Sequence, residues 1–356
     1  MLNIGDFNND QILDVAFFSF RSIGFSVLLG SDNGTFENMT HFSSTNNIIV
    51  NAMALGDLNG DSLLDIVFIG TFSNQVGVLF GKGNGDFYPV TFLSVGNSNF
   101  TYRADLVVAD FNNDNFTDIA VINYELNRVG ILLGNGNGSF SKQMGLFTGR
   151  SSYVISMVTN DLNNDNYLDI IVVNNNQNNI GVFLGYGNGS FQAQNAFFTG
   201  GSVFAIYAAV GDLNGDGFLD VIISYTVKYS VGIMFGYGNG SFDTPIKFMA
   251  DSYWTSYQIT IVDFNGDGHL DIAMSQTDFL VVNILLGDGN GNFQKQTILS
   301  TNIPVSNTWI DFGDFNKDGY QDIITLFSPR DTVYVIFNEC GCCTNEGFKL
   351  LTTVQP

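Results

Sequence analysis

One short pattern of acidic and amide residues occurs seven times in this chain of 356 residues. In DLNGDGFLD, residues 212–220, aspartates stand at positions 1, 5 and 9 and an asparagine stands at position 3. Carboxylates so close in sequence repel one another unless a cation lies between them. The pattern therefore predicts a metal-binding loop.

The ligand types in this loop favour calcium. Ca²⁺ takes roughly six to eight oxygen ligands, which positions 1, 3, 5 and 9 and a backbone carbonyl at position 7 can supply. An EF-hand would close with glutamate at position 12 and lie between helices, and zinc would require Cys or His. The alternative is an ordinary Asp/Asn/Gly turn, although a turn needs no acid at position 9.

We therefore expect up to seven Ca²⁺ ions, one in each loop. The predicted ligands are Asp6, Asn8, Asp10, Asp14, Asp57, Asn59, Asp61, Asp65, Asp110, Asn112, Asp114, Asp118, Asp161, Asn163, Asp165, Asp169, Asp212, Asn214, Asp216, Asp220, Asp263, Asn265, Asp267, Asp271, Asp314, Asn316, Asp318 and Asp322. Position 6 should adopt a left-handed turn, which favours glycine and then asparagine. Gly217, Gly268 and Gly319 suit it, Asn115 and Asn166 are acceptable, and Gln11 and Ser62 should be strained.

The loops recur at intervals of 51, 53, 51, 51, 51 and 51 residues, so the chain is a repeat array. Sixteen residues after the last aspartate of each loop comes a glycine, which mostly opens an Asn-Gly turn; only the seventh repeat has Asn338 there. The short Val-, Ile- and Phe-rich runs between these landmarks predict four antiparallel strands per repeat, in repeat five at residues 205–212, 219–225, 231–236 and 242–250.

Seven such repeats predict an all-β fold, a seven-bladed β-propeller of four-stranded antiparallel blades with calcium-binding loops. Residues 1–356 should form this single domain, with blades at about 1–50, 51–103, 104–154, 155–205, 206–256, 257–307 and 308–356. Residues 1–6 should be the inner strand of blade one and residues 347–354 the outer strand of blade seven, so that no blade is shared between the two ends.

The D-x-N-x-D-x-x-x-D loops and the hairpins that follow them, as in VLFGKGNGDF and IMFGYGNGSF, resemble the FG-GAP and VCBS repeats of integrin α-subunit propellers and many extracellular proteins. The resemblance covers the whole chain and implies a seven-bladed propeller with calcium in its loops. It does not imply integrin function, because the chain shows no inserted von Willebrand-type domain, leg domain or membrane segment. All seven repeats carry a loop, whereas only some do in integrin heads, so we expect a free-standing or differently partnered propeller.

Charge and composition limit the classes of partner that the chain could bind. Twelve basic and 34 acidic residues give a net charge of −22, which disfavours nucleic acid and anionic membrane surfaces. No apolar run is long enough for a membrane span, and the N-terminus lacks a signal-peptide pattern. Cys340, Cys342 and Cys343 form one cluster, in which a metal or redox role is a minor alternative because a fourth ligand is missing.

Few residues offer acid–base or nucleophilic chemistry. His269 occupies position 7 of a loop, His41 stands alone, and the acids outside the loops are scattered. We therefore expect no enzyme, but an extracellular calcium-binding propeller that acts as a binding or adhesion module for protein or glycan. The alternative is a propeller-scaffold enzyme or a lectin-like carbohydrate-processing protein.

A partner should bind on the face opposite the loops, because the connections there vary while the framework does not. Aromatic residues and arginine dominate contact energies, so the predicted partner-binding residues are Arg103, Arg128, Arg150, Tyr225, Tyr229, Trp254, Tyr257 and Trp309. The alternative is that the aromatic residues pack between blades. Calcium loops of moderate affinity suit an extracellular protein or cell-surface ectodomain. N-x-S/T sequences agree, although Asn-Gly-Ser is also good turn chemistry; they occur at Asn33, Asn38, Asn99, Asn115, Asn137, Asn188 and Asn239.

Overall fold

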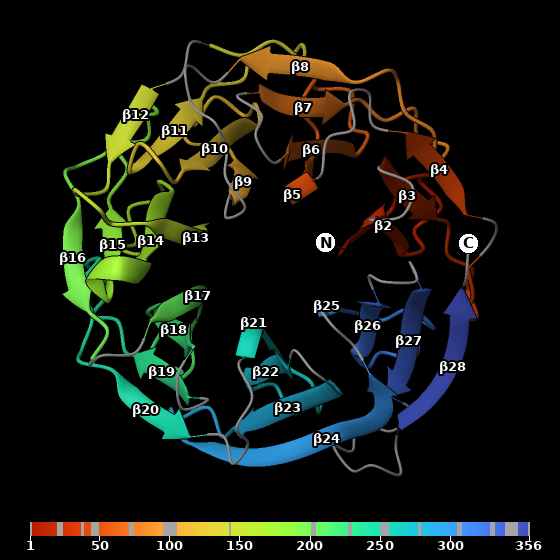
Figure 1. The fold of residues 1–356 in the computed structure, drawn as a ribbon. Coiled ribbons are helices and arrows are strands. Elements are labelled where there is room, and N and C mark those ends of the chain that lie inside the picture. The colour runs from red at the N-terminus through yellow and green to blue at the C-terminus, as the bar shows by residue number, and fades with distance from the viewer. Residues whose placement is uncertain are drawn as a thin grey trace.

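A computed structural model describes residues 2–19, 24–36, 39–43, 50–70, 75–94, 105–141, 144–200, 204–226, 230–249, 256–276, 279–304, 308–327, 332–338 and 348–354. These residues form seven four-stranded antiparallel sheets, arranged as a ring around a central axis (Figure 1). The predicted all-β, seven-bladed propeller is therefore confirmed.

The strands pair in sequence order within each blade, from an inner strand near the axis to an outer strand at the rim (Figure 1). Blades one to three contain β1 (Leu2–Gly5), β2 (Asp14–Ser19), β3 (Gly24–Leu28), β4 (Thr40–Ser43), β5 (Val50–Gly56), β6 (Asp65–Gly70), β7 (Gln75–Leu79), β8 (Thr91–Ser94), β9 (Leu106–Ala109), β10 (Asp118–Asn123), β11 (Arg128–Leu132) and β12 (Met144–Phe147).

Blades four to seven continue the same order. They contain β13 (Val154–Asn160), β14 (Asp169–Asn174), the 3₁₀ turn η1 (Asn175–Gln177), β15 (Asn179–Phe183), β16 (Asn195–Phe198), β17 (Ala205–Gly211), β18 (Asp220–Tyr225), β19 (Ser230–Met234), β20 (Ile246–Met249), β21 (Ser256–Val262), β22 (Asp271–Gln276), β23 (Phe279–Gly287), β24 (Phe293–Pro304), β25 (Thr308–Gly313), β26 (Asp322–Phe327), β27 (Thr332–Asn338) and β28 (Phe348–Val354).

Blade five shows how closely the expected strands agree with the observed ones. β17, β18 and β19 lie within a residue or two of the predicted runs. The outer strand differs, because Phe242 forms only an isolated bridge with Gly236 and continuous pairing begins at Ile246 in β20. The hairpin therefore ends in a short bridge before the edge strand proper begins.

The hydrophobic core lies between neighbouring blades. Every residue of β6, β10, β14 and β18 is buried, as expected for strands with a packed blade on each side. One core cluster joins blades seven and one, where Leu2 and Phe17 pack with Leu326 and Val333. Each blade thus buries its apolar side chains against its neighbours.

The two ends of the chain meet in adjacent blades without sharing one. β1 pairs with β2, and β28 pairs with β27 through positions such as Val333 opposite Val354. The expected closure with complete blades at both ends is confirmed. On the loop face of this seam, Lys317 forms an exposed ion pair with Asp32 at 2.8 Å. No helix in the described ranges has the length and hydropathy to cross a membrane.

Candidate functional site

Each acidic loop folds back on its own backbone, and blade five illustrates the geometry. The carboxylate of Asp212, at position 1, accepts hydrogen bonds from the backbone N–H groups of Gly215, Asp216 and Gly217 at 2.8, 3.2 and 2.9 Å. The amide of Asn214, at position 3, donates to Asp216 at 2.9 Å. Asp216, at position 5, accepts from the N–H of Phe218 at 2.8 Å. Positions 1, 3 and 5 therefore gather their oxygens around one turn.

Two positions of the loop need left-handed backbone. Position 6 has positive φ in every repeat, including 65° at Gln11 and 64° at Ser62, so the predicted left-handed turn is confirmed. Gly217 has open space where a Cβ would lie. Position 4 is also left-handed, for example at Asn9 with φ 61°, a feature that the sequence analysis missed. The prevalence of Asn and Gly there was the available signal.

The aspartate at position 9 has a role that its residue type did not disclose. Asp220 is fully buried; one of its oxygens accepts from the N–H of Leu213 at 2.9 Å and the other accepts from the N–H of Gly236 at 2.9 Å. The other six loops repeat this pair of bonds. The last aspartate and the hairpin position sixteen residues later are thus joined by a direct hydrogen bond. This aspartate anchors the start of the loop to the hairpin of its own blade.

Burial raises the pKa of these anchoring aspartates. The pKa of Asp220 rises to about 6 because burial outweighs its two backbone hydrogen bonds, and Asp216 and Asp212 raise it further by charge repulsion. The pKa of Asp322 rises to about 7 for the same reasons. The carboxylates of one loop therefore lie close enough to interact electrostatically.

Position 2 links four of the loops to the next blade through a backbone hydrogen bond. The carbonyl of Phe7 accepts a hydrogen bond of 3.0 Å from the N–H of Gly85, in the hairpin of blade two. Equivalent bonds join Gly189 to Phe111, Gly240 to Leu162 and Gly291 to Leu213. The acidic loops and the Asn-Gly turns therefore share one face of the ring, as the blade topology predicts.

The side chains of the loops suit a hard cation such as Ca²⁺, since the metal ligands that they offer are carboxylate and amide oxygens. Carboxylate oxygens that accept one hydrogen bond keep a second acceptor site. As the side chains stand, however, the described residues include no group of three or more His, Cys, Asp or Glu that could hold a metal ion. Calcium binding at positions 1, 3, 5 and 9 stays a prediction.

The predicted partner-binding residues have mixed positions. Arg128, at the start of β11, and Arg150 are exposed. Tyr225 is fully buried, and its hydroxyl donates to the carbonyl of Thr199 at 2.7 Å, so this residue packs between blades and is unavailable to a partner. Tyr257 and Trp309 lie in β21 and β25. Arg103, Tyr229 and Trp254, like the three cysteines, lie outside the described residues.

On the same face, two aromatic residues that the sequence analysis did not select lie together. Tyr124 and Tyr153 stack with ring centroids 5.0 Å apart and an interplanar angle of 19°. Tyr153 has φ 49°, an uncommon conformation for a bulky residue. Its N–H donates to the Asn127 side chain at 3.4 Å, and its carbonyl accepts from the N–H of Asn175 at 3.3 Å. The pair depends on the left-handed backbone at Tyr153, which the residue types in the sequence do not predict.

The two histidines contact neighbouring strands and turns. His41 Nδ1 lies 3.1 Å from the hydroxyl of Ser26 in the neighbouring strand β3. His269 donates its backbone N–H to Asp267 at 2.9 Å, and its ring lies over Gly289 of the hairpin. Both side chains therefore have structural surroundings.

Comparison with known proteins agrees with the repeat pattern. The family model described as FG-GAP-like repeat matches residues 6–68, 57–121, 110–172, 161–223, 212–274 and 276–325. No curated protein sequence matches the chain. An Agrocybe aegerita lectin that specifically recognises non-reducing terminal N-acetylglucosamine is similar in structure, with a TM-score of 0.67, 20% identity, and 99% of this chain and 94% of that chain covered.

Two enzymes have the same fold. The periplasmic gluconolactonase PpgL of Pseudomonas aeruginosa gives a TM-score of 0.62 at 11% identity, covering 99% of this chain and 94% of that chain. Virginiamycin B lyase of Staphylococcus aureus gives 0.60 at 14% identity, with 94% and 97% covered. The expectation that the chain is not an enzyme is therefore wrong. Proteins with this fold include a lactonase and a lyase, so the residue content alone does not exclude an enzyme. Scarce histidines do not exclude catalysis on a propeller.

Proposed function

Because the chain belongs to the FG-GAP-like repeat family, we propose that it is an extracellular propeller whose loops bind Ca²⁺ and whose opposite face binds a protein or glycan. The observation that carries this proposal is the sevenfold repetition of one loop in which only oxygen donors gather around a turn. Bound dications would neutralise the loop carboxylates. Positions 1, 3, 5 and 9 of this chain would hold them.

The loops also bear on the stability of the whole ring. Position 9 fixes each loop to its own hairpin, and in four loops position 2 forms a backbone hydrogen bond to the next blade. A cation that holds positions 1, 3 and 5 would therefore stiffen contacts both within and between blades. The gain per site is RT ln(1 + [L]/Kd), or about 2.7 kcal/mol at a hundredfold excess of free ion over Kd.

An extracellular location suits sites of this kind, because extracellular calcium is concentrated enough to fill sites of modest affinity. The sequons at Asn137 and Asn188 lie on exposed hairpins, which is compatible with glycosylation. Their side-chain oxygens accept hydrogen bonds from Ser139 and Ser190, so turn chemistry also accounts for these sequences. The proposal of location therefore depends on the loops more than on the sequons.

The surface that we propose for a partner lies between blades three and four, on the face opposite the loops. It presents the stacked Tyr124 and Tyr153 beside the exposed Arg128 and Arg150, an aromatic and cationic combination typical of contact residues. Gln177, from η1, donates to the carbonyl of Arg150 at 2.9 Å and holds this segment in place. The segment is thus ordered before any partner binds.

A glycan array and a pull-down of extracellular proteins would identify the partner. The variants Tyr153→Ala and Arg150→Ala should lose at least tenfold in affinity, while Tyr186→Ala, an exposed aromatic on the loop face, should not. Chelation should weaken binding through loss of stability. Loss of binding in Tyr186→Ala alone would move the partner to the loop face and overturn the proposal. A panel of lactone and lyase substrates tests for catalysis.

A further inference from the structure

A pocket of about 560 Å³ lies between blades one and two, apart from the surface proposed for a partner. Its walls come from β2 to β7 and from the segment that leaves the hairpin of blade two. A volume of this size lies in the usual range of small-molecule sites.

The pocket owes its shape to a local departure from the repeat. Five residues before the hairpin position, blade one has Phe25, whereas the other six blades have Val or Ile at the equivalent place. Phe25 stacks on Phe42 with centroids 4.8 Å apart, and Phe42 meets Phe87 edge-on at 5.3 Å. Rigid rings cannot fill an irregular gap as branched aliphatic side chains can.

The exposed fractions agree with this explanation. Phe25 retains 6% exposure, whereas Val76 and Val129 at the equivalent position are 0% exposed. Phe68 and Leu79, across the pocket, retain 5% and 6%. These apolar side chains line the pocket, and each keeps a small accessible area.

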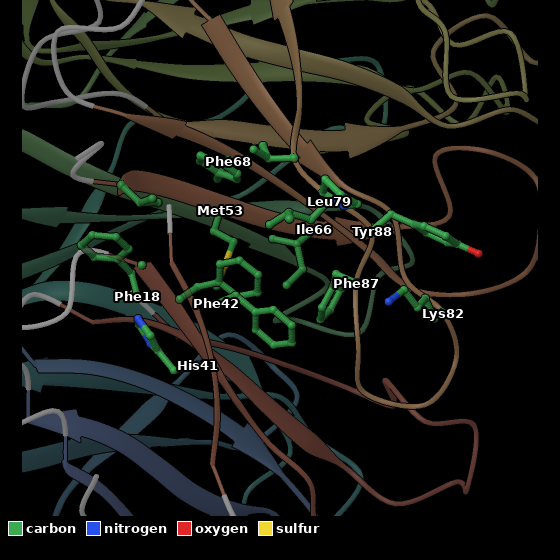
Figure 2. Close-up of a pocket in the computed structure, with 15 residues that line it drawn as sticks. Phe18, His41, Phe42, Met53, Ile66, Phe68, Leu79, Lys82, Phe87 and Tyr88 are labelled. Carbon is green, nitrogen blue, oxygen red and sulfur yellow. The ribbon is translucent and has the colours of Figure 1, made fainter. Parts of the chain in front are cut away.

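The polar groups of the pocket stand at its ends. Figure 2 shows Lys82 and Tyr88 together at one end and His41 on the other side of the apolar lining. The ammonium of Lys82 lies 5.3 Å from the centre of the Tyr88 ring. None of the fifteen described residues that line the pocket is acidic, although acids outnumber bases 34 to 12 in the whole chain. No acid in the described ranges forms an ion pair with Lys82.

We propose that this pocket binds a small hydrophobic carboxylate, with its apolar body between blades one and two and its carboxylate at Lys82. The apolar walls favour the body of such a ligand because its burial removes apolar surface from water. The ammonium supplies the matching charge, and it does so in a chain whose overall charge of −22 otherwise repels anions. The site is distinct from the surface between blades three and four, and its Lys82 end belongs to the hairpin that contacts the acidic loop of blade one.

Calorimetric titration of the whole chain with decanoate and with decanol, both as monomers in solution, tests the two parts of the proposal. Decanoate should bind with one-to-one stoichiometry. Lys82→Gln should weaken decanoate about tenfold and change decanol by less than about twofold, because only the anion uses the ammonium. The matched control is Lys247→Gln, another exposed lysine, which lies 5.2 Å from the ring of Tyr225 and should change neither ligand.

A filled pocket provides the second test. Val50→Phe adds volume at a buried wall and should abolish binding of both ligands. If that variant does not fold, Val90→Phe, at the less buried edge, should serve the same purpose. Three results would overturn the proposal: no saturable binding of decanoate to the natural chain, equal losses in Lys82→Gln and Lys247→Gln, or a dimer that Val90→Phe dissociates, since a second copy would then occupy the pocket.

Discussion

The side-chain amide of Asn338 donates a hydrogen bond of 3.1 Å to the backbone carbonyl of Phe264, the position-2 residue of blade six. In blades two, four, five and six, the N–H of a hairpin glycine makes this contact with the preceding blade. In blade seven a side chain also reaches this position of the preceding blade. The N–H of Asn338 still reaches the anchoring aspartate Asp322 at 2.9 Å.

Asn338→Ala and Asn338→Gly should each lower the free energy of unfolding by about 1–2 kcal/mol, because both remove the side-chain amide that donates to the buried carbonyl of Phe264. Urea unfolding followed by circular dichroism measures the change. Asn290→Ala, in an exposed turn of blade six, should change it by less than about 0.5 kcal/mol. Variants of Asn338 that unfold like the natural chain would show that this bond contributes nothing.

Two aspartates of one loop should respond differently to calcium. Asp216→Asn changes an exposed side chain, so it should reduce only the gain in melting temperature that Ca²⁺ provides. Asp220→Asn should cost about 2–4 kcal/mol with or without calcium, because an amide cannot accept from both Leu213 and Gly236 and places a donor against a backbone N–H. Calorimetry with calcium and with chelator separates the two effects. If neither calcium nor chelator changed the melting temperature of the natural chain, the loops would be ordinary turns that bind no calcium.

The left-handed position 6 allows a stabilising change. Gln11→Gly and Ser62→Gly should each raise the free energy of unfolding by up to about 1 kcal/mol, because glycine adopts positive φ without Cβ strain. The reverse change, Gly217→Ser, is the matched control and should lower it by a similar amount, although a Cβ there meets open space. Equal stability in all three variants would mean that the side chains at position 6 carry no strain.

The stability of the ring should depend on pH through Asp105. Its carboxylate accepts from the N–H of the next residue, Leu106, and from the N–H of Met157 in blade four, both at 3.0 Å, and burial raises its pKa to about 6. Since the folded pKa exceeds the ordinary value of about 3.9, its contribution is fully present below about pH 4 and is lost as pH rises through about 6.

The free energy of unfolding of the natural chain, relative to Asp105→Asn, should therefore fall between pH 4 and pH 7, by at most about 3 kcal/mol. Urea titrations at several pH values measure this difference. Asp86→Asn, in an exposed hairpin, serves as the control and should give a difference that stays level. A difference that grows with pH for Asp105→Asn would contradict the raised pKa.

Much of the fold follows from the period of the sequence. Asp220 and Gly236 recur with their sixteen-residue spacing in almost every repeat, and that regularity determines the number of blades, the order of strands and the face on which the loops lie. The left-handed backbone at Gln11 was equally accessible, since it follows from the turn geometry that glycine satisfies in other repeats. Local patterns repeated seven times leave little freedom in the architecture.

Contacts between repeats were much harder to predict. Tyr225 was predicted to contact a partner because it is aromatic and lies near a connection on the face opposite the loops, but it is buried and its hydroxyl donates to the carbonyl of Thr199, which precedes its blade. The stacking of Tyr124 on Tyr153 likewise joins two blades and depends on backbone that no residue type indicates. A side chain's partners across blades are set by three-dimensional packing, which the period alone does not encode.

The seam between blades one and seven gives the ring a mechanical weak line. Within each blade the strands are joined by backbone hydrogen bonds. Between the first and last blades, the described residues make apolar contacts and the Lys317–Asp32 ion pair. A pulling force applied at the two ends of the chain therefore meets this seam first. The first and last blades would separate while each blade stayed folded, and only greater force would break the pairing of strands within the blades.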